Sequence, residues 1–178
     1  KLEIPGIQYD ELLTITLDKL VTVLQPLTND SLAYNKNDIS TVLINSNFSC
    51  GFFIDRFKLY EILKLKYNII AAYDPCSYPG IQCKFYYNQN KEKQDGKCLC
   101  DKKCDSKNKV CKIISFMVFR TGSVLIVGHC DEQILTIIYL FLKQLLLDEF
   151  ENIQVEDCEM KEKKKKVKKK RKRQIIIW

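Results

Sequence analysis

Four cysteines fall within fourteen residues of a polar stretch that shows neither helix nor strand periodicity: Cys98, Cys100, Cys104 and Cys111. Four thiolates can close a tetrahedral zinc site, and a bound metal supplies folding energy to a segment that lacks a hydrophobic core. The spacing is not the paired Cys-x2-Cys of most zinc motifs. Three interpretations therefore stay open for these candidate ligands: structural zinc, free thiols and disulfides.

The other residue types that commonly do chemistry form no such cluster. The chain has nine cysteines, an odd number, and shows no secretory leader, so we expect a reducing compartment with mostly free thiols. Its single histidine, His129, follows a glycine at the start of an expected helix and has no nucleophile pattern around it. The sequence contains no paired carboxylates and no phosphate-binding glycine loop. We predict that the protein is not an enzyme and takes no small-molecule substrate.

The positive charge is concentrated at the end of the chain. Residues 161–173 hold eleven lysines and arginines and one glutamate, which leaves a net charge of about −3 elsewhere in a chain whose formal charge is +7. The folded part is therefore not a strongly basic nucleic-acid binder by charge alone. We expect residues 152–178 to be a disordered basic tail: a nuclear address, a DNA tether or a solubilising segment. The longest apolar run, residues 134–147, is too short to span a bilayer, so no membrane role is expected.

Hydrophobic periodicity divides the chain into helices, strands and an insertion. Residues 88–111 follow no period and are expected to be an inserted loop, and residues 28–39 a polar connector. The expected elements are helices at 7–25, 55–66 and 131–148 and strands at 40–54, 81–87, 112–119 and 123–127. This order predicts an α+β fold with helices on one face of an antiparallel sheet.

Both faces of the predicted sheet are apolar. Successive side chains of a strand point to opposite faces. The side that the helices cover is expected to carry Ile114, Phe116, Val118, Val124 and Ile126. The opposite side is expected to carry Ser115, Met117, Phe119, Leu125 and Val127. A contiguous exposed patch of this kind marks an interaction surface; burial by the inserted loop or by another subunit is the alternative.

The first residues of the chain resemble its last strand and helix. When Gly6 is aligned with Gly128, the next eighteen positions need no gap, and both copies run from an extended segment into glycine and an apolar-periodic helix. Self-similarity of this kind marks a fold built from repeated units. We expect one complete unit preceded by the strand and helix that end another. Because the chain begins at Lys1 within this pattern, we also expect a fragment or a processed product.

Three motifs connect the complete unit to a known family: Tyr73-Asp74-Pro75, Tyr78-Pro79-Gly80-Ile81 and the run from Val118 to Gly128. With them, residues 40–151 resemble one repeat of the TATA-box-binding protein family, and residues 1–27 resemble the end of the preceding repeat. In the third motif the family has a hydrophobic-Phe-x-Ser-Gly-Lys segment followed by Thr-Gly-Ala. The cysteine-rich insertion and the lysine-rich tail resemble the divergent versions carried by large cytoplasmic DNA viruses.

The resemblance implies a saddle whose concave sheet lies in the DNA minor groove, in the family that is itself the standard example of kinking by inserted side chains. The kinking aromatics fall on Tyr78 and Phe119, the phosphate-contacting arginine on Lys84 and the hairpin serine on Thr121. The groove displays mainly the acceptors of A·T pairs, which suits amide donors and apolar contacts. The residues expected to contact DNA are Asn45, Asn47, Tyr78, Lys84, Met117, Phe119, Thr121, Leu125 and Val127.

Several positions depart from the family pattern. Tyr78 replaces a phenylalanine, and Ser123 replaces a lysine that would contact phosphate. In the partial first unit, Glu3 and Pro5 take the places that match Leu125 and Val127. A carboxylate facing the groove repels phosphates, and proline cannot donate to a central strand ladder. We therefore expect the first-unit half to bind DNA poorly.

The function implied by the resemblance is that of a general transcription initiation factor. Such a factor binds and bends double-stranded promoter DNA and recruits a B-type initiation factor and RNA polymerase, in the host nucleus or a cytoplasmic viral factory. No cofactor is required beyond the structural zinc considered for the insertion. The alternative is a degenerate scaffold that keeps the fold and binds proteins without specific DNA binding.

Overall fold

A computed structural model describes the protein at residues 2–98, 100, 104 and 110–155. The chain forms two compact units, Lys1–Thr41 and Val42–Trp178. The basic segment at 161–173 lies outside the described residues, as do residues 156–160 and 174–178. Within the described residues, no helix has the length and apolar character needed to cross a membrane.

The first unit consists of one α-helix and two short 3-10 turns. Helix α1 spans Asp10–Leu24, η1 spans Gln25–Leu27 and η2 spans Lys36–Asp38. The strand expected before α1 is not formed, since residues 2–9 contain no helix or strand. A strand is stabilised by hydrogen bonds to a neighbouring strand, and this unit offers no partner strand among its described residues. Helix α1 begins at Asp10 instead of residue 7, and Leu17 is its one buried residue.

The second unit is built on a five-stranded antiparallel sheet with the order β1-β6-β5-β4-β3. Its strands are β1 (Ile44–Ser49), β3 (Ile70–Ala72), β4 (Ile81–Tyr87), β5 (Lys112–Val118) and β6 (Ser123–Gly128). Strands β2 (Phe53–Ile54) and β7 (Gln154–Val155) form a separate two-stranded pair. The structure confirms the α+β class and the antiparallel sheet.

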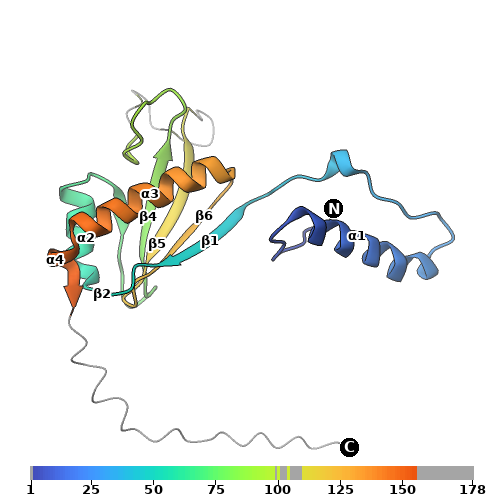
Figure 1. The fold of residues 1–178 in the computed structure, drawn as a ribbon, viewed down its shortest axis with the longest axis horizontal. Coiled ribbons are helices and arrows are strands. Elements are labelled where there is room, and N and C mark those ends of the chain that lie inside the picture. Colours follow the sequence, from blue (N-terminus) through green and yellow to red (C-terminus); the bar gives the residue numbers. More distant parts are fainter. Residues whose placement is uncertain (1, 99, 101–103, 105–109, 156–178) are drawn as a thin grey trace, which may run out of the picture. The chain divides into compact units, whose positions relative to one another are not determined.

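Helices α2 (Arg56–Leu65) and α3 (Glu132–Asp148) pack against the sheet, with α3 lying across the strands (Figure 1). Each begins at an aspartate: the Asp55 carboxylate accepts hydrogen bonds from two backbone N–H groups at 3.0 and 3.2 Å, and Asp131 accepts one from the Ile134 N–H at 2.8 Å. Such caps satisfy N–H groups that have no partner inside the helix. The buried helix residues pack on the strand residues predicted for the covered side, Ile114, Phe116, Val118, Val124 and Ile126.

A short helix, α4 (Phe150–Ile153), closes the second unit and corrects the predicted tail boundary. Residues 152–155 do not belong to a tail. Ile153 is fully buried, its carbonyl accepts a hydrogen bond from the Asp55 N–H at 2.7 Å, and β7 pairs with β2. The sequence pattern at 152–155 is too short to signal an element, and its structure comes from hydrogen bonds to Glu149 and from the contact with residues 53–55.

The one buried carboxylate of the described core, Glu149, belongs to this closing segment. It accepts hydrogen bonds from the Lys66 ammonium at 2.5 Å, the Tyr67 hydroxyl at 2.9 Å and the Asn152 amide at 3.0 Å. The Lys66 hydrogen bond is the chief cause that lowers the pKa of Glu149. Burial, together with Glu149, raises the pKa of Tyr67 to about 12. A buried charge must be paired, and these three donors supply the pairing.

Candidate functional site

One face of the five-stranded sheet carries no member of the core cluster packed against α2 and α3. We call it the open face, and its residues are Asn45, Asn47, Ile70, Ala72, Gln82, Lys84, Tyr86, Ile113, Ser115, Met117, Leu125 and Val127. The register aligns them directly across neighbouring strands: Asn47 opposes Leu125, Leu125 opposes Met117, and Met117 opposes Gln82. Opposed side chains in an antiparallel sheet lie on the same face within contact distance. Six of the nine residues predicted to contact DNA therefore share this face.

Exposure separates the two faces of the sheet. Phe116 and Val124 are fully buried on the helix side, whereas Met117 and Leu125, their neighbours in sequence, are only half-buried. Beside this centre, Asn45 and Asn47 on the edge strand β1 and Gln82 and Lys84 on β4 are exposed, whereas Ser115 on β5 is half-buried. The open face thus has an apolar centre on β5 and β6 between polar side chains on β1 and β4, with the exposed apolar residues Ile70 and Ala72 on the other edge strand, β3.

Two aromatic rings from separate loops meet at one end of the open face. Tyr78 precedes β4 and Phe119 follows β5, and their ring centroids are 5.9 Å apart. The Tyr78 hydroxyl lies 3.6 Å from the Met117 sulfur and can donate a hydrogen bond to it. The hydroxyl that this position adds to the family pattern is therefore partnered. A Cβ atom added to Gly80 would lie 3.0 Å from the Phe119 ring, so glycine allows the two loops to approach.

The β5–β6 hairpin holds Phe119 in a fixed turn. The Phe119 N–H donates to the Ser123 carbonyl at 2.9 Å, and the Gly122 N–H donates to the Phe119 carbonyl at 3.0 Å. Gly122 has φ of +79°, and an added Cβ atom would lie 2.2 Å from the Phe52 carbonyl oxygen. Only glycine fits both constraints. Thr121 is exposed at the tip of this turn, next to the aromatic pair.

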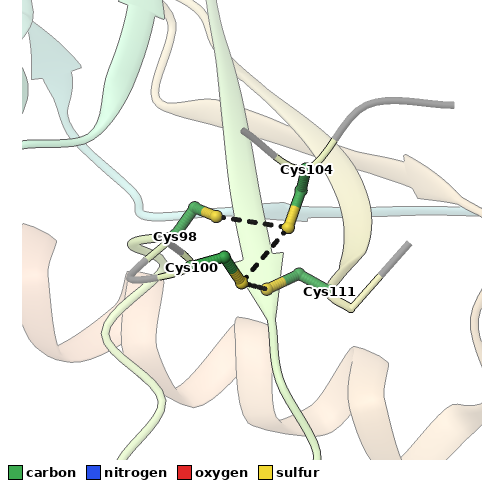
Figure 2. Close-up of side chains that lie close together, drawn as sticks. All are labelled: Cys98, Cys100, Cys104 and Cys111. Carbon is green, nitrogen blue, oxygen red and sulfur yellow. Dashed lines mark hydrogen bonds between the residues drawn. The ribbon is translucent and has the colours of Figure 1, made fainter. Parts of the chain in front are cut away.

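The cysteine-rich insertion brings its four thiols together (Figure 2). Three sulfur–sulfur distances link them in a chain: Cys98 to Cys104 at 3.3 Å, Cys104 to Cys100 at 3.4 Å and Cys100 to Cys111 at 3.6 Å. All four sulfurs lie within 4.8 Å of one another. These separations exceed a disulfide bond of about 2.05 Å. They are close to the edges of about 3.8 Å of a tetrahedron with zinc–sulfur bonds of about 2.3 Å. The cluster can hold a metal ion.

The surroundings of the cluster favour negative sulfur at one position and neutral sulfur at another. The Cys100 backbone N–H is the chief cause that lowers the pKa of Cys98 to about 7. Burial is the chief cause that raises the pKa of Cys111.

The insertion also covers one end of the sheet: the Gly96 carbonyl accepts a hydrogen bond from the Tyr86 N–H at 3.0 Å, and Tyr86 is only 8% exposed. Burial by the loop, the alternative considered for the second face, therefore occurs at Tyr86.

Four other residues considered in the sequence lie outside both the open face and the cysteine cluster. His129 is exposed, and its Nδ1 atom lies 3.0 Å from the Val42 carbonyl oxygen near the start of α3. Cys83 is buried in the core, where desolvation raises its pKa to about 12. Glu3 and Pro5 lie in the first unit, and no strand forms there to place them on a sheet.

Sequence reasoning missed two sets of residues at the site. Gln82 lies on the open face opposite Met117, and extending the alternation of β4 by two residues from Lys84 would have found it. Arg56 and Arg120 lie beside Phe119, but they come from a helix and a turn 64 residues apart in the sequence, and no local pattern connects them. Neither a family model nor a curated protein nor a solved structure matches the chain.

Proposed function

We propose that the second unit binds double-stranded DNA in the minor groove through the open face and bends it, as a transcription initiation factor similar to the TATA-box-binding protein family. The observation that carries this proposal is the arrangement of the open face. An apolar centre of Met117, Leu125 and Val127 lies between exposed amides on one side and a lysine on the other, with an aromatic pair at one end.

The chemistry of this face suits a minor groove. The groove displays the acceptors of adenine and thymine, to which Asn45 and Asn47 can donate from their exposed positions on β1. Lys84 can approach a phosphate at the flank of the face. Phe119 and Tyr78, held at the end of the sheet, are placed to wedge into a base step and open it. Opening a step bends the duplex and lets it follow more of the protein surface.

Zinc is the metal that we propose for the cluster of Cys98, Cys100, Cys104 and Cys111. A site made only of thiolates with tetrahedral spacing favours zinc over the oxygen-binding cations. The metal would fix the insertion against β4 and thereby keep Tyr86 covered. Its role in this proposal is structural, since four protein ligands leave no open coordination position for catalysis.

The protein partners of the proposed factor are a B-type initiation factor and RNA polymerase, on the side of α2 and α3. Its place of action is the host nucleus or a cytoplasmic viral factory, and no enzymatic step is assigned to it. The rival function is a scaffold that binds proteins through the open face. The half-buried apolar centre is compatible with this rival, so the two functions are separated by DNA binding.

Binding to short A·T-rich and G·C-rich duplexes separates these functions. We expect the full chain and a form that ends at Val155 to bind the A·T-rich duplex more tightly, because the minor groove distinguishes A·T from G·C pairs. The shortened form must keep Ile153, which is buried, and the β2–β7 pair. Fluorescence anisotropy at several salt concentrations measures both affinities.

The shortened form also decides the contribution of residues 156–178. If the full chain binds both duplexes equally and the shortened form binds neither, binding comes from phosphate contacts of the basic segment. That result would leave the scaffold as the function of the sheet.

A further inference from the structure

A shallow hollow of about 400 Å³ lies beside Phe119, at the end of the sheet where the β5–β6 hairpin meets the start of α2. It is lined by Arg56, Pro79, Phe119, Arg120, Thr121 and Ser123. Two of these side chains carry a positive charge, two carry hydroxyl groups, and none is a carboxylate. Residues 1–155 hold eighteen acidic and eighteen basic side chains and have no net formal charge, so the positive charge of this hollow is local.

The guanidinium of Arg56 is held in position by two contacts. It donates a hydrogen bond to the Pro79 carbonyl oxygen, and its central carbon lies 5.3 Å from the centroid of the Tyr73 ring. An arginine has five N–H donors, so one bond to a carbonyl leaves others to face a ligand. Holding a charged side chain beforehand lowers the entropy that is lost when a ligand binds.

The opposite wall of the hollow is the hairpin, which is equally constrained. The Arg120 carbonyl accepts a hydrogen bond from the Ile54 N–H at 2.8 Å, and the Gly122 carbonyl accepts one from the Cys50 N–H at 2.9 Å. Residues 50–54 therefore anchor the turn that presents Arg120 and Thr121. One wall is thus fixed by backbone hydrogen bonds of the hairpin and the other by the contacts of the Arg56 side chain.

We propose that this hollow binds one phosphodiester group of the DNA backbone, next to the base step that Phe119 opens. The inference rests on the proposed function and names the contact that holds the strand beside the wedge. Guanidinium groups bind phosphate oxygens with paired, charge-assisted hydrogen bonds, and hydroxyl groups add neutral donors. Because Phe119 itself lines the hollow, a phosphate bound there belongs to a nucleotide adjoining the inserted ring.

The two arginines lie near Ser123, where the family pattern has a lysine. The family resemblance puts a phosphate-contacting lysine at the position of Ser123, and here Ser123 lines the hollow together with both arginines. The positive charge that binds phosphate at this end of the sheet therefore comes from Arg56 and Arg120.

The salt dependence of duplex binding tests this proposal. We expect the double variant Arg56→Gln/Arg120→Gln to bind A·T-rich and G·C-rich duplexes more weakly than the wild type, by the same factor for both, on the order of tenfold. We expect the slope of log K against log salt to fall by about 1, the contribution of one phosphate contact. Lys58→Gln, which removes a charge from the same helix outside the hollow, is the matched control and should leave the slope less changed.

Each outcome decides between the site and the function on which it rests. If Phe119→Ala weakens binding while the double variant keeps the wild-type slope, the hollow does not bind phosphate and the DNA function stands. If the wild-type chain binds neither duplex, both proposals fail. Replacing chloride by inorganic phosphate at constant ionic strength shows whether the hollow binds a phosphate of the DNA backbone or free phosphate. We expect wild-type affinity to be unchanged, and a loss that the double variant does not share would assign the hollow to free phosphate.

Discussion

Replacing Phe119 by alanine is expected to weaken binding to an A·T-rich duplex by about five- to 150-fold, since contact between an aromatic ring and a base contributes about 1–3 kcal/mol. The ring is held at the end of the open face by the hairpin and by Tyr78, at a centroid distance of 5.9 Å. It is half-buried in the free protein, so its loss should cost the fold only a fraction of the free energy of unfolding that a core ring contributes.

Phe116→Ala is the matched control for this variant. Phe116 lies on β5, three residues before Phe119, points to the helix side and is fully buried. Its removal is expected to lower the free energy of unfolding by about 3–5 kcal/mol. Anisotropy titration and chemical denaturation of both variants measure the two quantities. A Phe119→Ala variant with unchanged DNA affinity, or one as unstable as Phe116→Ala, would mean that the ring serves the fold and not the groove.

Removing zinc is expected to release the cysteine-rich insertion while the five-stranded sheet stays folded. We expect one zinc ion per chain, measured by elemental analysis of the protein purified under reducing conditions. Cys104→Ser should lower zinc affinity by more than about a hundredfold, because losing a ligand costs more than losing an outer partner of a ligand. The sulfur atoms of the cluster lie within 4.8 Å of one another, so one serine breaks the set.

The structural consequence should appear at Tyr86 and in the segment before Cys98. With a chelator, amide hydrogen exchange should speed up in residues 88–98 and at the Tyr86 N–H, which donates to the Gly96 carbonyl. Cys76→Ser is the control, since Cys76 is exposed and outside the cluster. Purified protein without zinc and with four freely reactive thiols would identify the cluster as free thiols. Protection that persists with the chelator would show that the insertion folds without metal.

Alternation and end signals in the sequence were enough to predict the central elements. The bounds of β4 agree with the predicted strand at both ends, because Ile81, Cys83 and Phe85 alternate with polar residues. Helix α3 begins one residue after its predicted start, with Asp131 as its cap. The assignment of Phe116 and Val124 to the covered face is confirmed by their complete burial.

Elements that depend on tertiary contacts could not be predicted. Strand β3 is three residues long, and Ile70-Ala71-Ala72 becomes a strand only by pairing with β4. The predicted first strand of the sheet extended from residue 40, but the strand starts at Ile44, where pairing with Gly128 begins. Residues 2–9 have the extended pattern, but no strand of the described part of the chain pairs with them, so pattern alone failed there.

The candidate site shows the same division. The common face of Asn47, Leu125 and Met117 follows from the period of a strand once the register is known. The closeness of the four thiols does not follow from their spacing, which differs from the usual zinc motif. Arg56 and Arg120 line the same hollow because residues 50–54 contact the hairpin, and no local sequence pattern predicts this contact.

The bend of an A·T-rich duplex is the measurement that tests the central claim most directly. Energy transfer between dyes at the two ends of the duplex reports the bend on addition of the form that ends at Val155. The open face predicts that this form shortens the end-to-end distance of the A·T-rich duplex and that Phe119→Ala shortens it much less. Tight binding to a duplex that stays straight, or no binding without residues 156–178, would contradict minor-groove insertion by the open face.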